Sequence, residues 1–189
     1  MSVAHLAALG HTRIAHIAGP PQVSTGEGRR RGFLEGMDAS GLPVHDELIV
    51  TANGYTVDEG TRCCRELLAA GARFTAMAVA NDMLAVGCYA ALDEAGLRCP
   101  DDMSVVGFND MPFIDRLRPP LTTVRFPHYQ LGTEAAQLLL ERVTSRESPV
   151  KILYLAPELI VRASTAPPAD ASGKTVQGPR PVPLRRSAR

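Results

Sequence analysis

Apolar runs of strand length alternate with segments of helix length along most of this 189-residue chain, and that alternation restricts the fold more than any other feature. Regular alternation of strand and helix is typical of a mostly parallel sheet, because parallel neighbours need a crossover connection between them. The run FTAMAVA over Phe74–Ala80 is apolar at nearly every position, as expected of a strand covered on both faces. We therefore predict an α/β fold of three layers, with helices on both faces of the sheet.

The order of the elements follows from hydrophobic periodicity and from the residues that begin and end helices. We expect strands over residues 13–18, 47–51, 74–80, 103–108 and 122–125, and two further short β runs over 150–155 and 158–161. We expect helices over residues 3–9, 26–39, 56–70, 82–96 and 128–143. Asn81 or Asp82 should cap the fourth helix, since both side chains accept hydrogen bonds from N–H groups of a first turn.

Composition indicates a globular domain. Hydrophobic residues make up 45% of the chain and charged residues 21%, which is ordinary for a folded domain. No run approaches the roughly 18 to 20 apolar residues that span a bilayer. The first residues, MSVAHLAALGHTR, lack the regions of a secretory signal. We expect a cytoplasmic protein that contacts no membrane.

The formal net charge of zero conceals an uneven distribution of charge. Basic residues gather beyond residue 163, in a segment rich in Pro, Ala, Ser, Gly and Arg that cannot bury enough apolar surface to offset its ordering entropy. We predict a folded part over residues 1–163 and a disordered basic tail over residues 164–189. The folded part is mildly acidic, unlike a nucleic-acid-binding surface, and the tail would attract DNA only weakly and without sequence preference.

Polar or amphipathic side chains follow each of the first four predicted strands. In chain order they are Ser24, Thr25, Arg29, Tyr55, Asn81, Asp82, Asn109 and Asp110. In a doubly wound sheet, ligands bind outside the carboxyl ends of the strands. Arginine can fork onto hydroxyl or carboxylate groups, asparagine both donates and accepts, and tyrosine offers a face for stacking. The set predicts a site for a polyhydroxylated or heterocyclic small molecule, although each residue alone could instead be a helix cap or a surface charge.

Recognisable motifs for catalysis, metal binding or phosphate binding are absent from the sequence. Gly26, Gly28 and Gly32 have the spacing G-x-G-x-x-x-G, one residue too long for a dinucleotide fingerprint. The five histidines lack metal-ligand spacing, and no motif places a second acid or base near Asn109 and Asp110. The four cysteines, Cys63, Cys64, Cys88 and Cys99, show no C-x-x-C spacing and are expected to be reduced. We predict a binding protein without cofactor or metal; an NAD-type enzyme is the less favoured reading.

Four long segments, in order, resemble the sensor domain of LacI/GalR-type transcriptional regulators. They are HLAALGHTRIAHIAGP, STGEGRRRGFLEGM, VANDMLAVGCYAALDEAGLRCPDDMSVVGFND and PPLTTVRFPHYQLGTEAAQLLLERV, and the resemblance spans residues 3–163. It implies one lobe of a periplasmic-binding-protein-like type I fold. In that fold a small effector, commonly a sugar, sugar phosphate, nucleoside or purine, binds in the cleft between two lobes. A solute-binding protein of a sugar transport system shares the fold and is the alternative function.

The resemblance also assigns roles to the candidate residues. It implies that Thr25 and Arg29 contact the effector, that Tyr55 stacks on it, and that Asn81 with Asp82 forms a polar pair beside it. Asn109 stands where most members of the family have an aspartate, which leaves the hydroxyl pattern of the effector open, and the carboxylate of Asp110 is adjacent. These seven residues are the predicted ligand-binding set.

Three further expectations rest on the resemblance. The family's helix-turn-helix, hinge helix and first lobe do not appear in the sequence, so we expect a truncated regulator or half-sensor that makes no DNA contact itself and binds ligand weakly. The helix over 128–143 would pack on the absent lobe, with its stripe of Leu131, Ala135, Leu138 and Leu139 partly exposed. A homodimer contact is implied on the helix over 82–94 and the loop over 111–117, through Met83, Val86, Tyr89 and Ala90.

Overall fold

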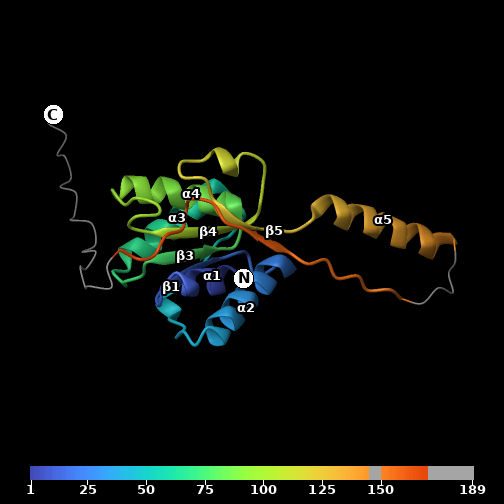
Figure 1. Cartoon of the computed structure of the whole chain (residues 1–189), viewed down its shortest axis with the longest axis horizontal. Helices are drawn as coiled ribbons and strands as arrows, with labels where there is room; N and C mark the ends of the chain where they lie inside the picture. The colour runs from blue at the N-terminus through green and yellow to red at the C-terminus, as the bar shows by residue number, and fades with distance from the viewer. Residues whose placement is uncertain (145–149, 170–189) are drawn as a thin grey trace.

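A computed structural model describes residues 1–144 and 150–169. Its centre is a six-stranded sheet with the strand order β2-β1-β3-β4-β5-β6 (Figure 1). The strands are β1 (Ile14–Ala18), β2 (Ile49–Thr51), β3 (Ala76–Val79), β4 (Ser104–Asn109), β5 (Thr122–Arg125) and β6 (Glu158–Ile160). All neighbours are parallel except the antiparallel pair β5 and β6. The predicted mostly parallel sheet is confirmed.

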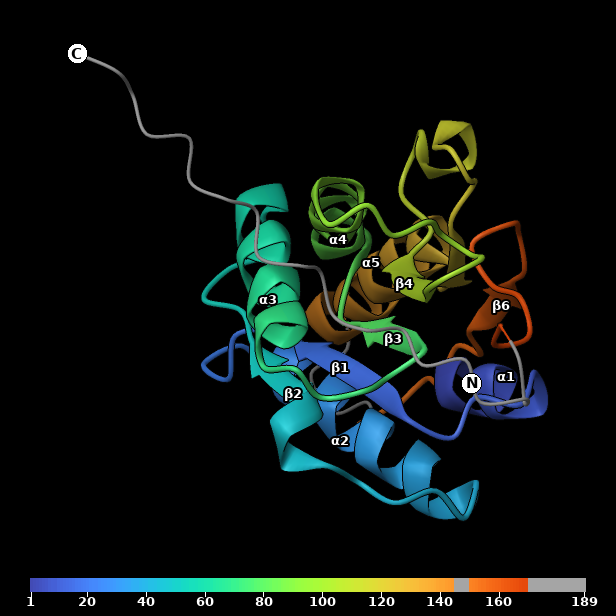
Figure 2. The ribbon, with the colours of Figure 1, turned by 90° about the vertical axis from the view of Figure 1, so that its left-hand side faces the viewer.

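Helices cover both faces of this sheet, which confirms the three layers (Figure 2). The helices are α1 (Ser2–Ala8), α2 (Ser24–Ala39), α3 (Val57–Ala69), α4 (Asp82–Glu94) and α5 (His128–Thr144), with short 3₁₀ turns η1 (Asp46–Leu48) and η2 (Ile114–Arg116). Successive strand residues face opposite sides. Ala15 and Ile17 of β1 join the core beneath α3 and α4, whereas Ile14 joins the core beneath α1 and α2.

Local sequence explains where α3 and α4 begin. The Thr56 hydroxyl accepts a hydrogen bond from the backbone N–H of Glu59 at 3.2 Å, and the Asn81 side chain accepts one from Leu84 N–H at 2.9 Å. Each contact satisfies one of the N–H groups that a first turn leaves unpaired. Of the two residues predicted to cap the fourth helix, Asn81 is therefore the cap.

The helices α3 and α4 approach so closely that a side chain would not fit between them at Gly87. A Cβ atom there would overlap backbone atoms of Val57 and Thr61. The Thr61 hydroxyl uses the short separation to donate to the carbonyl of Gly87 at 3.1 Å. Cys63, Cys64 and Cys88 are buried as free thiols and Cys99 is a partly buried free thiol. Burial raises the pKa of Cys63 to about 11, which leaves that thiol protonated.

The β run predicted over 150–155 is not a strand. Only residues 158–160 pair with the sheet, and the side chains of Val150, Ile152 and Tyr154 are exposed. Branched and aromatic residues favour a strand only where a neighbouring strand is available to pair with them. Here the segment runs out beside α5, and the two form an arm that projects from the body (Figure 1). Lys151 and Glu141 join the two parts of the arm by an ion pair of 2.5 Å.

The folded part continues beyond residue 163, where the tail was expected to begin. The buried Ser164 hydroxyl donates to the carbonyl of Val105 at 2.6 Å and accepts from Thr122 N–H at 2.7 Å. The carbonyl of Ala166 accepts from His11 at 2.9 Å. Small polar residues thus complete the hydrogen bonds beside β4 and β5, which the composition of the segment does not reveal. Residues 170–189 of the predicted tail lie outside the described residues.

Within the described ranges, the structure contains no helix that is both long enough and apolar enough to cross a membrane.

Candidate ligand-binding site

Arg29 is the centre of the polar group at the carboxyl edge of the sheet. It lies in α2, one turn after Thr25, and its guanidinium reaches across the ends of β3 and β4. Nη1 donates to the carbonyl of Ala80 at 2.7 Å, and Nη2 donates to Oδ1 of Asn109 at 2.8 Å. Burial lowers the pKa of Arg29, but the ordinary value is so high that the group stays charged at neutral pH. The guanidinium is therefore fixed at both terminal nitrogens.

Aromatic rings flank this guanidinium. Its Cζ atom lies 4.3 Å from the centroid of the Phe108 ring and 5.6 Å from that of Tyr55. Such cation–π contacts stabilise a partly buried charge. The Tyr55 hydroxyl is 3.3 Å from the Thr25 hydroxyl. Tyr55 can lie over the end of β1 because Gly19 has no side chain, since a Cβ atom there would overlap the Tyr55 ring.

Thr25, Arg29, Tyr55 and Asn109, here called the Arg29 cluster, thus come together from α2, the loop before α3 and the end of β4. All four were predicted from the sequence. Together they offer hydroxyl groups, an amide and an aromatic face at the edge where parallel α/β sheets bind ligands.

The other predicted residues have different surroundings. Asn81 caps α4. Asp82 is fully buried, accepts from the Thr123 hydroxyl at 2.7 Å and from Met111 N–H at 2.8 Å, and has its pKa raised by burial. Its carboxylate therefore lies beneath the edge of the sheet and supports the loop after β4.

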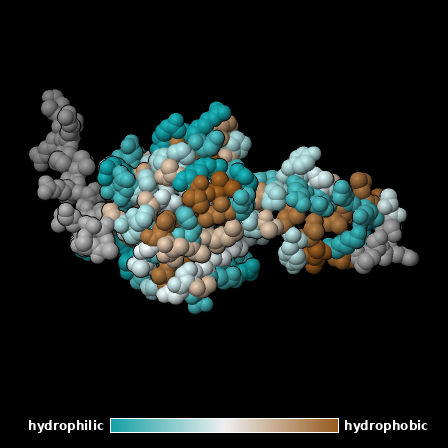
Figure 3. Space-filling view, in the orientation of Figure 1, coloured by the Kyte–Doolittle hydropathy of each residue, from teal (hydrophilic) through white to brown (hydrophobic). Residues whose placement is uncertain are grey.

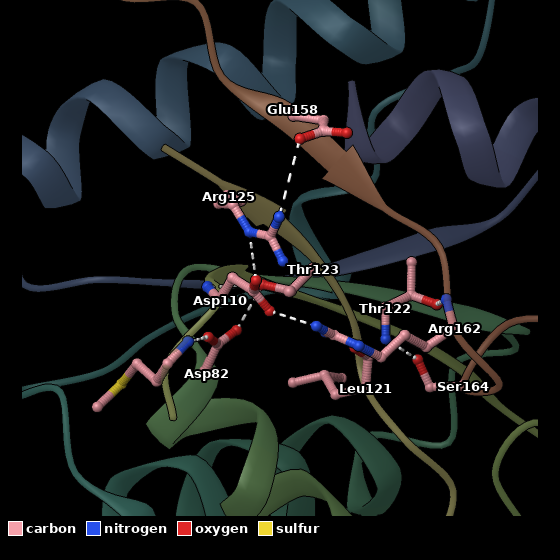
Figure 4. Close-up of polar contacts among 10 residues, drawn as sticks. Asp82, Asp110, Leu121, Thr122, Thr123, Arg125, Glu158, Arg162 and Ser164 are labelled. Atoms are coloured by element: carbon pink, nitrogen blue, oxygen red, sulfur yellow. Dashed lines mark hydrogen bonds and ion pairs between the residues drawn. The ribbon is translucent and has the colours of Figure 1, made fainter. Parts of the chain in front are cut away.

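Asp110 lies between two arginines (Figure 4). One oxygen accepts from Arg162 at 2.7 Å and the other from Arg125 at 2.5 Å. Burial alone would raise the pKa of this carboxyl, but the hydrogen bonds from the two arginines outweigh burial and lower it. Asp110 thus joins the end of β4 to β5 and to the chain after β6, while its neighbour Asn109 reaches Arg29.

Sequence reasoning did not single out Phe108, Arg125 or Arg162. Phe108 lies near the end of the largely apolar strand β4 and has the pattern of a core residue. The two arginines are 15 and 52 residues from Asp110 along the chain, and no local spacing marks such a pair. Only the pairing of β4 with β5 and of β5 with β6 brings these residues together.

A cavity of about 510 Å³ adjoins the Arg29 cluster. Its wall includes Thr25 and Arg29, together with residues from the α1 and α2 side of the sheet: His16, Phe33, Phe108 and Phe126. The volume is within the range of small-molecule sites. The edge of the sheet and this cavity together give a concave, partly aromatic surface beside a fixed positive charge.

A parallel α/β lobe with such an edge defines a ligand-binding lobe of the periplasmic binding protein-like class. The family model described as a periplasmic binding protein-like domain matches residues 3–165. The chain belongs to this family, as a sensor domain of the LacI/GalR type. The predicted fold and family are confirmed.

Known relatives are transcriptional regulators. The chain is 36% identical over 157 residues to the HTH-type transcriptional repressor PurR of Erwinia tasmaniensis, covering 83% of this chain and 46% of that protein. It is 34% identical over 169 residues to the HTH-type transcriptional regulator GalR of Escherichia coli, covering 89% and 49%. The chain spans about half the length of the curated relatives it matches. These relatives are regulators and not enzymes, in agreement with the predicted absence of catalysis.

Solved structures agree with this family. The complex of the transcriptional regulator CelR with cellobiose has a TM-score of 0.82 at 33% identity, and the match covers 86% of this chain and 49% of that one. A dimeric Lac repressor with a C-terminal deletion and a K84L substitution has a TM-score of 0.81 at 30% identity, covering 88% and 60%. A LacI family regulator from Enterococcus faecium with bound ribose has a TM-score of 0.77 at 30% identity, covering 88% and 61%.

Proposed function

We propose that this chain is the effector-sensing lobe of a cytoplasmic LacI/GalR-type transcriptional regulator, and that it binds a small molecule through the Arg29 cluster. The observation that carries this proposal is the fixed guanidinium of Arg29. It is held by Ala80 and Asn109 and flanked by the rings of Phe108 and Tyr55. A side chain fixed before the ligand arrives loses little further entropy on binding.

The sugar, sugar phosphate, nucleoside and purine classes are the candidate effectors. The hydroxyl groups of Thr25 and Tyr55 can each donate or accept, and the Asn109 amide can also donate. Cellobiose and ribose are bound in two of the similar solved structures. In this proposal Asn81, Asp82 and Asp110 support the site from behind, because their oxygens already accept hydrogen bonds within the protein.

We also propose that two copies associate through α4 and the loop over 111–117. Met83 and Val86 of α4 are partly exposed, and Phe113 is 72% exposed on the loop. Exposed apolar side chains on neighbouring elements favour burial against a partner, and one similar solved structure is a dimeric Lac repressor. DNA recognition, in this proposal, belongs to a full-length regulator and not to the surface described for this chain.

A thermal-shift screen tests the effector proposal. The full chain is melted with a panel of sugars, sugar phosphates, nucleosides and purines, beside the variants Arg29→Ala and Arg31→Ala. Arg31 is a matched control, because it lies in the same helix but is exposed and pairs with Glu35. At about 100 times its Kd a ligand stabilises a protein by about 2.7 kcal/mol.

We expect at least one member of the panel to raise the melting temperature of the wild type and of Arg31→Ala but not of Arg29→Ala. A ligand that stabilises all three proteins equally binds elsewhere and would contradict the proposed site. A panel that stabilises none of them, with cooperative melting retained, would contradict the sensing function.

A further inference from the structure

His16 forms part of the cavity wall and is buried, with 3% of its surface exposed. It lies in the middle of β1, and its ring stacks on Phe33 of α2 with 4.4 Å between centroids and 6° between planes. Its Nδ1 atom is 2.7 Å from the carbonyl oxygen of Ala78. A carbonyl only accepts, so Nδ1 carries the proton of this hydrogen bond.

The other ring nitrogen is left as an acceptor. Burial lowers the pKa of His16 to about 4, so the ring is neutral at physiological pH, and Nε2 holds a lone pair. Nε2 is buried and has no hydrogen-bond partner among the described residues. The desolvation cost of this buried acceptor is uncompensated, and a donor from a ligand would remove that cost.

The rest of the wall is mainly apolar and aromatic. Rings of Phe33, Phe108 and Phe126 face the cavity together with Val79 and Val124. Such rings pack well against another flat ring. A ligand that buried several hydroxyl groups against this wall would leave most of them without partners.

Thr25 and Arg29, the polar side chains that α2 contributes to the wall, make contacts within the protein and also belong to the Arg29 cluster. Both terminal nitrogens of Arg29 donate within the protein, and the Thr25 hydroxyl lies beside that of Tyr55. The wall therefore combines a stacking surface, the fixed cation of Arg29, the Ser2 hydroxyl, and His16, whose Nε2 is a buried acceptor without a partner among the described residues. This set matches a flat ring with one donor better than a polyol.

We infer that the cavity is a subsite for a flat heteroaromatic ligand, or a heteroaromatic part of one, whose N–H or O–H group donates to Nε2 of His16. The inference rests on the proposed function, because the cavity shares Thr25 and Arg29 with the effector site. It narrows the candidate effectors to molecules that contain a heteroaromatic ring with an N–H or O–H donor.

Indole and benzofuran provide a direct test, because they have nearly the same shape and only indole has an N–H donor. Their affinities for the full chain are measured by ligand-observed NMR, beside ribose and the thermal-shift panel. The variant His16→Phe keeps a ring against Phe33 but has no acceptor, and Arg31→Ala is the exposed control. We expect wild type and Arg31→Ala to bind indole about tenfold more tightly than benzofuran, and His16→Phe to bind the two alike.

Equal affinity of the wild type for the two probes would overturn the inference, and so would a preference for indole that persists in His16→Phe. The wild-type comparison remains decisive if His16→Phe does not fold. If sugars bind in an Arg29-dependent way and neither aromatic probe binds, the subsite is wrong and the proposed function stands. If no molecule binds in an Arg29-dependent way, the proposed function itself fails.

Discussion

Asn109 and Asp110 are consecutive residues with positive φ, 120° and 56°, at the end of β4. Such conformations cost up to about 1–3 kcal/mol each for residues other than glycine and cluster at functional sites, and asparagine and aspartate adopt them more readily than other side chains do. Here side-chain contacts hold them in place. Arg29 binds Asn109, and Arg125 with Arg162 binds Asp110. The same contacts that stabilise the turn also aim the Asn109 amide at the Arg29 cluster.

Asp110→Asn should therefore weaken both folding and ligand binding. The substitution removes a carboxylate whose side chain is only 8% exposed from between two arginines. We expect the free energy of unfolding to fall by about 2–4 kcal/mol, near the range for breaking a buried ion pair. Ligand affinity should also fall, because Asn109 loses its support. Urea unfolding and the thermal-shift screen measure the two effects, with the exposed Asp38→Asn as control.

The same variant should change the response to acid. The pKa of Asp110 is lower in the folded protein than its ordinary value. The ionised carboxylate therefore stabilises the fold at pH values above the unfolded pKa of about 4. This stabilisation is lost as the pH falls through the lower pKa of the folded protein. We expect the wild type to lose more stability than Asp110→Asn between about pH 5 and pH 2. Identical losses in the two proteins would show that the carboxylate is not paired in solution.

Residue-level prediction from the sequence worked where position along a strand determines the environment. Thr25, Arg29, Tyr55 and Asn109 could be predicted to lie together because the carboxyl ends of parallel strands share an edge. The sequence does not separate these residues from Asp82, whose carboxylate turns into the core to meet Thr123. Burial of a polar side chain depends on distant partners, and one sequence does not show them.

At the scale of elements, the contact between α3 and α4 depends on glycine. Gly87→Ala should push the helices apart, because the new Cβ atom meets backbone and not a flexible side chain. We expect a loss of about 1–3 kcal/mol in the free energy of unfolding, typical of an overpacked core.

Gly32→Ala in α2 is the matched control for this substitution. No atom lies within 4 Å of a Cβ placed there, so the better helix propensity of alanine should stabilise the protein by up to about 1 kcal/mol. Chemical denaturation of both variants measures the difference. Equal effects of the two substitutions would mean that the helices are not in close contact.

Periodicity predicted the helices and the parallel strands well, since each has a repeating apolar pattern and a cap or glycine at its end. It was wrong for residues 150–155, whose composition favours a strand but which meet no partner strand. It also placed the end of the folded part too early, because Ser164 packs by hydrogen bonds and not by apolar burial.

At the scale of the molecule, the arm that contains α5 presents apolar atoms to solvent (Figure 3). The predicted exposure of this helix is confirmed: Leu131 and Leu139 are exposed, and α5 has no buried residue. Leu140 and Val143 extend the apolar surface, at 65% and 69% exposed. The resemblance predicts that this helix packs on a second lobe. Contiguous apolar surface of this kind favours association.

We expect the full chain to form species larger than a dimer at high concentration. The double substitution Leu139→Glu with Val143→Glu should remove them, because it places charge on the exposed apolar surface. Gln130→Glu with Gln137→Glu adds the same charge at exposed positions on a different side of α5 from Leu139, Leu140 and Val143 and should change association less. Sedimentation velocity measures the size distribution. This role of α5 would be contradicted if the wild type formed no species larger than a dimer. It would also be contradicted if Leu139→Glu with Val143→Glu left those species unchanged.

Chemical-shift mapping on the full chain locates the bound effector. The chain is labelled with ¹⁵N and titrated with the most stabilising molecule of the panel, and changes in amide chemical shift are followed. We predict the largest changes at Thr25, Arg29, Tyr55 and Asn109, in fast exchange, because the lobe alone should bind weakly. Changes confined to α4 or to the loop over 111–117, with the Arg29 cluster unaffected, would contradict the claim that this edge of the sheet is the sensing site.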